Sequence, residues 1–168
     1  MSDKKLLLDV DNLKVHFKIK SDKAWPWSPA LTLKAVDGVS IKLYEGETLG
    51  VVGESGCGKS TFARAIIGLV PSTEGKVVWL GQDLTRLPHR EMREKRKEIQ
   101  MIFQDPLASL NPRMTIGDII AEPLRTFYPA LSKVEVMDKV KTIMMKVGLL
   151  PNLINRYPHE FSGGQCQR

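Results

Sequence analysis

The segment GESGCGKST, at residues 53–61, constrains the fold of this chain more than any other feature. Gly53 is followed after four residues by Gly58-Lys59-Ser60, which is the spacing of a phosphate-binding loop. The apolar run at 48–52 predicts a buried strand before the loop, and residues 59–69 predict a helix after it. A phosphate-binding loop needs this context, whereas a glycine-rich turn without a ligand, the alternative interpretation, does not. The sequence therefore predicts an α/β fold.

The chemistry of this loop is that of a triphosphate site. Its glycines permit backbone angles and close approaches that a Cβ would block. Successive N–H groups can then converge on phosphate oxygens at the positively polarised start of the helix. Lys59 would reach the β- and γ-phosphates, and the Ser60 hydroxyl would ligate Mg²⁺. The candidate nucleotide-binding residues of the loop are Gly53, Ser55, Gly56, Cys57, Gly58, Lys59, Ser60 and Thr61.

The composition is that of a soluble globular protein, with 168 residues, 42% hydrophobic and 26% charged. No apolar run reaches the roughly 18–20 residues that cross a bilayer, and the run at 6–8 is too short for a signal-peptide core. We therefore expect a cytoplasmic protein. Cys57 and Cys166 lie far apart and make no metal-binding spacing, so both are expected to be free thiols.

The net charge of +6 does not by itself indicate a nucleic-acid partner. Much of the excess lies at residues 86–97, RLPHREMREKRK, where Glu91 and Glu94 alternate with basic side chains. This pattern is typical of a solvated helix face. Aromatic residues are few and do not alternate with basic ones, so no platform for stacked bases is predicted.

The first half of the chain is predicted to be rich in strands. Residues 21–29, which include Trp25 and Trp27, predict a rigid connector. A turn at Asp11-Asn12 and another at Glu45-Gly46 are predicted to separate strands. Besides 48–52, the predicted strands are 6–10, 13–19, 39–43, 75–80 and 99–103.

From Asp105 onwards the pattern changes from strands to helices. A short helix at 115–121 is predicted to begin at a Thr115 cap and to stop before Pro123. A second helix begins at a capping box formed by Ser132 and Glu135. Met137 and Met144 fall on its apolar face with Val136, Val140, Ile143 and Val147, and we interpret the methionines as core residues rather than as ligands.

Two further motifs follow the phosphate loop. Gln104 stands at the end of the predicted strand 99–103, where the helical pattern begins. The sequence FSGGQ, at 161–165, places Ser162 at the predicted start of a helix, where backbone N–H groups can bind an anion. Each motif is weak alone, but their order after the phosphate loop is not a chance arrangement.

With these three motifs the chain resembles the ATP-binding subunits of ABC transporters. The loop at 53–60, the Q-loop at Gln104 and the signature motif at 161–165 match, with Phe161 in place of the usual leucine. The likeness is closest to the ATPases of bacterial oligopeptide and dipeptide importers, in particular their F-type subunit, and it covers essentially the whole chain. The segments that carry it are 33–40, 44–69, 100–124 and 155–168.

The resemblance implies a P-loop NTPase of the ABC ATPase type, with an N-terminal antiparallel β subdomain, RecA-like core strands and a helical subdomain. It places the ATP-binding core with the β subdomain and phosphate loop at 1–104, the helical subdomain at 105–160 and the signature motif at 161–168. Family members continue with a strand that ends in Asp-Glu, and the sequence contains no such strand. We therefore expect that the C-terminal part of the core is missing, and that this chain binds ATP but hydrolyses it poorly.

The resemblance also implies roles for single residues. Phe17 falls at the position where an aromatic ring of the family stacks on adenine. In the alternative interpretation, Phe17 is an ordinary half-buried residue of a strand, and Trp25 or Trp27 supplies the ring. Gln104, together with Ser60, would hold Mg²⁺ and would orient the attacking water. The signature residues, which would contact the γ-phosphate held by a partner ATPase, are Ser162, Gly163, Gly164 and Gln165. The switch histidine of the family comes after the signature motif, so the three histidines of this chain, which all precede it, are read as ordinary residues.

The implied partners are a second ABC ATPase in a head-to-tail dimer, two membrane permease subunits and, indirectly, a peptide-binding protein. The implied location is peripheral, at the cytoplasmic face of the inner membrane. Three alternatives stay open: a small phosphate-loop kinase, a soluble ABC-type ATPase that acts on DNA or ribosomes, and a non-catalytic fragment.

Overall fold

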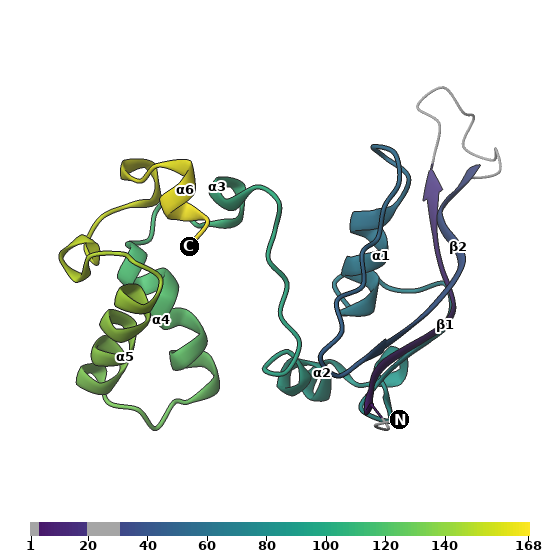
Figure 1. Ribbon diagram of the computed structural model, residues 1–168, viewed down its shortest axis with the longest axis horizontal. Coiled ribbons are helices and arrows are strands. Elements are labelled where there is room, and N and C mark those ends of the chain that lie inside the picture. The colour runs from purple at the N-terminus through teal and green to yellow at the C-terminus, as the bar shows by residue number, and fades with distance from the viewer. Residues whose placement is uncertain (1–3, 20–30) are drawn as a thin grey trace, which may run out of the picture. The chain divides into compact units, whose positions relative to one another are not determined.

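The computed structural model describes residues 4–19 and 31–168 (Figure 1). These residues form two compact units, divided between Met101 and Ile102. The predicted connector at 21–29, with Trp25 and Trp27, lies outside the described residues.

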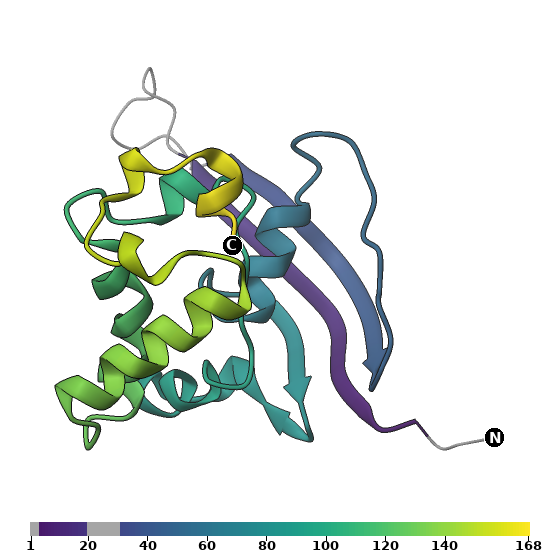
Figure 2. The ribbon, with the colours of Figure 1, turned by 60° about the vertical axis from the view of Figure 1, so that its left-hand side comes forward.

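The first unit is built on a four-stranded antiparallel sheet with the order β2-β1-β3-β4. Its strands are β1 (Leu6–Ile19), β2 (Leu31–Tyr44), β3 (Glu74–Trp79) and β4 (Gln82–Asp83). Helix α1 (Lys59–Ile66) covers one face of this sheet (Figure 2) and buries Phe62 and Ala65 against it. A 3₁₀ turn, η1 (Leu84–Arg86), and helix α2 (His89–Lys95) complete the unit, and α2 adds Met92 to the same core.

Strand β1 is continuous, so the predicted turn at Asp11-Asn12 is wrong. Val10 and Leu13 are both buried although they lie three residues apart, and the β1–β2 register shifts between them. In a regular strand every second side chain faces the core, so Val10 and Leu13 would face opposite sides. The extra residue of a β-bulge between them turns both side chains to the core. Asn12 has a φ of 46°, a conformation that asparagine tolerates better than most residues. The turn signal at these residues therefore marks an irregularity within one strand. The predicted turn at Glu45-Gly46 is confirmed.

Two predicted buried strands are also wrong. Residues 48–52 and 99–103 have no strand conformation, and the side chains of Val52 and Ile102 are 96% and 89% exposed. A buried strand needs a hydrogen-bonded neighbour along its edge. None of the four strands in the described part of the chain pairs with either segment. Gln104 consequently follows an irregular, exposed segment and not a strand.

The second unit is helical. Its helices are α3 (Pro106–Ser109), α4 (Ile116–Phe127), α5 (Lys133–Lys146) and α6 (Gly163–Cys166), with 3₁₀ turns η2 (Pro151–Leu153) and η3 (Pro158–Glu160). Its core buries Ala121, Val140 and Met144 completely, and Met137 packs against it, so these two methionines are core residues as predicted. Ile143, predicted on the same face, is 45% exposed. No helix in the described ranges combines the length and the apolarity that crossing a membrane requires.

The helix starts in this unit are as predicted, but one helix end is not. Thr115 Oγ1 accepts the Asp118 N–H at 3.2 Å and caps α4. The predicted stop before Pro123 is wrong, because α4 continues to Phe127 with the proline inside it. A proline removes one N–H donor from a helix, and here packing of the flanking Ala121 and Leu124 in the core stabilises the helix across it.

Candidate phosphate-binding site

The phosphate loop begins α1 through a glycine in a left-handed conformation. Gly58, the N-cap of α1, has a φ of 100° and a ψ of 0°. A Cβ at this position would lie 2.1 Å from the carbonyl oxygen of Ala35 in β2. Gly56 also has a positive φ, of 82°, but a Cβ there would meet no atom within 4 Å. The loop therefore passes against β2 at Gly58 and opens towards solvent at Gly56.

Lys59 is folded back across the loop that precedes it. Its Nζ donates to the carbonyl oxygens of Gly53 and Glu54, both at 2.7 Å, and lies 3.7 Å from the Sγ of Cys57. The first turn of α1 contains no acidic side chain. The ammonium group and the positive end of the helix are thus concentrated at the same loop, which suits a phosphate chain.

An open cavity of ≈ 370 Å³ adjoins this loop. One side consists of Gly56–Thr61, and the other consists of Phe17 from β1 with residues 33–35 of β2. The structure therefore brings Phe17, whose surface is 39% exposed, opposite loop residues that lie 39 or more positions later in the sequence, Gly56–Thr61. Gly53 and Ser55 belong to the loop but do not line the cavity.

Strand β2 contributes to this cavity, although no motif in its sequence predicts that it does. Phe17 pairs with Leu33 in the β1–β2 register, and this pairing brings Leu33, Lys34 and Ala35 to the cavity. These residues carry no motif. They could have been found only by pairing residues 31–44 with the strand that carries Phe17.

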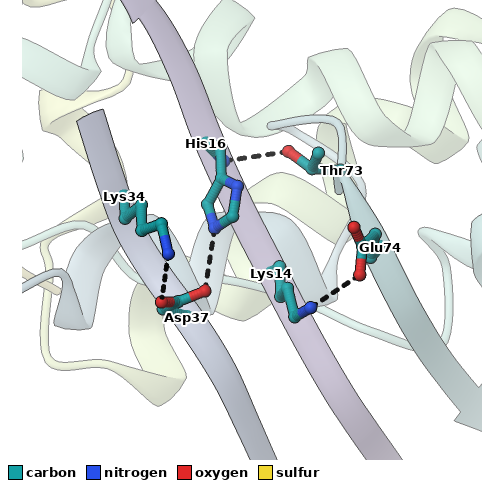
Figure 3. A network of polar contacts seen from close by, with 6 residues as sticks. All are labelled: Lys14, His16, Lys34, Asp37, Thr73 and Glu74. Carbon is teal, nitrogen blue, oxygen red and sulfur yellow. Dashed lines mark hydrogen bonds and ion pairs between the residues drawn. The ribbon is translucent and has the colours of Figure 1, made fainter. Parts of the chain in front are cut away.

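A polar network holds Lys34 beside the cavity (Figure 3). Lys34 Nζ donates to Asp37 Oδ2 at 3.1 Å, and His16 Nε2 lies 3.0 Å from Asp37 Oδ1. The hydrogen bond from Lys34, followed by that from His16, holds the pKa of Asp37 below its ordinary value. The Thr73 hydroxyl accepts the His16 N–H at 2.9 Å, and Lys14 Nζ donates to Glu74 at 2.6 Å. His16 is thus a strand residue that joins β1 to Asp37 of β2 on one side and to Thr73, the residue before β3, on the other.

Gln104 and the signature residues belong to the second unit, whereas the phosphate loop belongs to the first. Gln104 is exposed, and its neighbour Asp105 caps α3 by accepting the Ala108 N–H at 3.1 Å. The predicted helix start at Ser162 is confirmed, because Ser162 Oγ accepts the Gln165 N–H at 3.3 Å and the Gln165 side chain accepts the Ser162 N–H at 3.0 Å. A Cβ at Gly163 or Gly164 would meet nothing within 4 Å, so this face of α6 is open.

The loop fits a nucleotide with its metal ion better than it fits a metal ion held by protein alone. Among the described residues, no three His, Cys, Asp or Glu side chains are grouped so that they could hold a metal ion. Mg²⁺ is commonly held by one or two protein ligands together with phosphates and water, and the exposed Ser60 hydroxyl at the start of α1 can serve as one. Both cysteines are free, as predicted, and burial raises the pKa of the Cys166 thiol.

Comparison with protein families gives a match over most of the chain. The family model described as "ABC transporter" matches residues 36–168. Among curated proteins, the "Oligopeptide transport ATP-binding protein OppF" of Salmonella typhimurium is 72% identical over 168 residues, which are 100% of this chain and 50% of that protein. The protein of the same name from Escherichia coli is 71% identical over 165 residues, covering 98% of this chain and 49% of that protein. The chain thus spans about half the length of these relatives.

Solved structures agree with this match. A dimeric structure described as a post-hydrolysis state of the ATP-binding cassette MJ0796, bound to ADP and Pi, aligns with a TM-score of 0.80 and 26% identity. The alignment covers 95% of this chain and 65% of that one. A second dimeric structure of MJ0796, described as a bacterial ABC transporter cassette, aligns with a TM-score of 0.79.

Proposed function

The chain belongs to the ABC transporter family, and from this premise we propose that it is the nucleotide-binding part of an ATPase subunit that powers oligopeptide import. The observation that carries the proposal is the geometry of the phosphate loop. The Lys59 ammonium and the N-terminus of α1 lie at the same loop, and this loop lines the cavity that Phe17 also lines. The 72% identity to a protein named for oligopeptide transport supports the choice of cargo class.

Each part of this site has a task in the proposed function. The backbone N–H groups of Gly56–Ser60 and the Lys59 ammonium bind the phosphates, which requires that Lys59 exchange its carbonyl partners for phosphate oxygens. Ser60 supplies a hydroxyl ligand for Mg²⁺, and Gln104 a second ligand that also orients water. Phe17 stacks on the adenine ring. Magnesium-bound triphosphate supplies the energy of phosphoryl transfer when it is bound.

We place the remaining functions in an assembly. Two ATPase subunits pair head to tail, so that Ser162, Gly163, Gly164 and Gln165 of one chain face the γ-phosphate held by the other. The helical segment 105–160 transmits closure of this dimer to two permease subunits at the cytoplasmic face of the inner membrane. The dimeric state of the aligned MJ0796 structures supports the pairing.

We further propose that residues 1–168, taken alone, turn ATP over very slowly. Hydrolysis requires a group that positions and activates the attacking water. No two of the 19 acidic residues are adjacent, so these residues contain no strand that ends in Asp-Glu.

Calorimetry with Mg-ATP tests the proposed function. We expect saturable binding to the protein and loss of binding in Lys59→Ala, because the substitution removes the charge that faces the β- and γ-phosphates. Lys76→Ala, which removes an exposed ammonium from β3 outside the cavity, is the matched control and should bind like the wild type. Absence of heat with a folded wild-type protein, or undiminished binding in Lys59→Ala, would overturn the proposal.

A further inference from the structure

A second cavity lies in the first unit, at the opposite end of α1 from the phosphate loop. It occupies ≈ 290 Å³ between the C-terminal end of α1, the segment after β4 and helix α2. This volume is at the lower end of the range for small-molecule sites. Its wall is about half apolar and half polar, and the apolar part includes Ile66, Leu84, Leu87 and Met92. No residue of the phosphate loop lines it, so it is separate from the cavity beside Phe17.

The cation in this wall, the guanidinium of Arg96, has no carboxylate partner among the described residues. Within the described part of the chain, Arg96 makes no ion pair, and its side-chain hydrogen bond, from Nη2 to the Gly68 carbonyl, is long at 3.4 Å. Its Nε is shielded from water and has no hydrogen-bond partner. A guanidinium that is partly buried and poorly paired is unfavourable, so the cavity is electrostatically prepared for an anion.

The other polar groups that line the cavity are also compatible with an anionic ligand. His89 and the hydroxyl groups of Ser72 and Thr85 line it, and no aspartate or glutamate does so among the residues that the structure describes. The Thr85 hydroxyl is already engaged, since it donates to Asp83 Oδ1 at 2.5 Å. Ser72 and His89 are therefore the groups that can add hydrogen bonds to a ligand held by Arg96.

We propose that this cavity binds a small organic carboxylate with an apolar body. The fork of a guanidinium matches the two oxygens of a carboxylate, and such a pair is stronger in a site that is sheltered from water. The apolar part of the wall, around Leu84, Leu87 and Met92, receives the rest of the ligand, and burial of that body favours binding. Inorganic phosphate carries the charge but leaves the apolar wall unused, so it binds less tightly.

The proposal is tested by titrating the protein with 4-methylpentanoate and following the titration by protein NMR. We expect saturable shifts at residues of the cavity, and binding weaker by roughly tenfold or more in Arg96→Met, which loses the charge-assisted hydrogen bonds. Arg93→Met, at an exposed position of α2 three residues before Arg96, is the matched control and should bind like the wild type. The neutral probe 4-methylpentanamide has the same shape and should not bind.

Further variants separate this site from misfolding and from the phosphate loop. Arg96→Lys keeps the stem and the charge but loses the fork, so it should fold and should bind with intermediate affinity. Lys59→Ala should leave carboxylate binding unchanged, because the probe does not occupy the phosphate loop. Four results would overturn the proposal: no saturable binding by the wild type, equal binding by Arg96→Met, loss of binding in Lys59→Ala, or phosphate binding at this cavity as tight as that of the carboxylate.

Discussion

At Gly58 two independent constraints require glycine. The backbone is left-handed, with a φ of 100°, and the position of a Cβ is occupied by the Ala35 carbonyl oxygen at 2.1 Å. The first constraint is local, and the second comes from a strand more than twenty residues earlier in the sequence. Gly56 carries the local constraint alone, with a φ of 82° and free space around it.

This difference predicts unequal costs for two matched substitutions. Gly56→Ala should lower the free energy of unfolding by about 1–2 kcal/mol, the cost of a left-handed alanine. Gly58→Ala should lower it by about 2–5 kcal/mol, because the backbone of α1 or β2 must also move. Urea unfolding measures both values. Equal losses would contradict the close approach of Gly58 to β2.

Phe17 is the residue through which the proposed site would recognise the base. Stacking of a base on an aromatic side chain contributes about 1–3 kcal/mol, so Phe17→Ala should weaken nucleotide binding by roughly fivefold to a hundredfold. Phe17→Tyr keeps the ring and should bind normally. Leu31→Ala, which removes an exposed apolar side chain from β2 outside the cavity, is the control in a fluorescent-nucleotide titration. Full affinity in Phe17→Ala would favour an ordinary strand aromatic.

At the scale of the element, the helices of the second unit begin at side-chain caps that their local sequences specify. In α5 the Ser132 and Glu135 side chains bond reciprocally to each other's backbone N–H groups. These contacts satisfy donors that the helix itself leaves free. The side-chain hydrogen bond from Ser132, followed by the backbone one, lowers the pKa of Glu135 from 4.5.

The capping box predicts an acid-sensitive start of α5. The pKa of Glu135 is lower in the folded state than its ordinary value. The stabilisation that the Glu135 carboxylate gives to the folded state is therefore present above the ordinary pKa, and it is lost as the pH falls through the folded-state pKa. Ser132→Ala should cost about 1 kcal/mol at neutral pH and should reduce this acid-dependent loss. Thr142→Ala, which removes a hydroxyl bonded to the Asp138 carbonyl within the same helix, is the control. Amide exchange of the first turn of α5 measures the effect, and an unchanged acid dependence in Ser132→Ala would contradict it.

At the scale of the whole molecule, residues 4–19 and 31–168 form two separate hydrophobic cores. One lies between the sheet and α1, and the other joins α4 and α5 with the segments that follow them. Each unit therefore has its own source of stability.

Two adjacent methionines of α5 test this separation. Met144 is fully buried and Met145 is 59% exposed. Met144→Ala should destabilise the second unit by about 2–5 kcal/mol, because it leaves a cavity in the core, and Met145→Ala should have little effect. Hydrogen exchange followed by mass spectrometry should show lost protection after residue 101 and unchanged protection in β1 and α1. Equal loss across both units would contradict two independent cores.

The sequence by itself determined those features of this protein that depend on residues close together in the chain. The phosphate loop, the caps at Thr115, Ser132 and Ser162, and the family resemblance all depend on residues within a few positions of one another. The hydrogen bonds of the three caps close within one helical turn, so the sequence spacing is sufficient to predict them.

Only the tertiary structure decided what depends on partners far away in the chain. The runs 48–52 and 99–103 have the composition of buried strands, but composition cannot supply the neighbouring strand whose hydrogen bonds they need. The bulge at Asn12 keeps Val10 and Leu13 on one face, and the antiparallel register brings Phe17 and residues 33–35 to the loop. The contacts that make this cavity join side chains across the sheet, and their geometry exists only once the strands have paired.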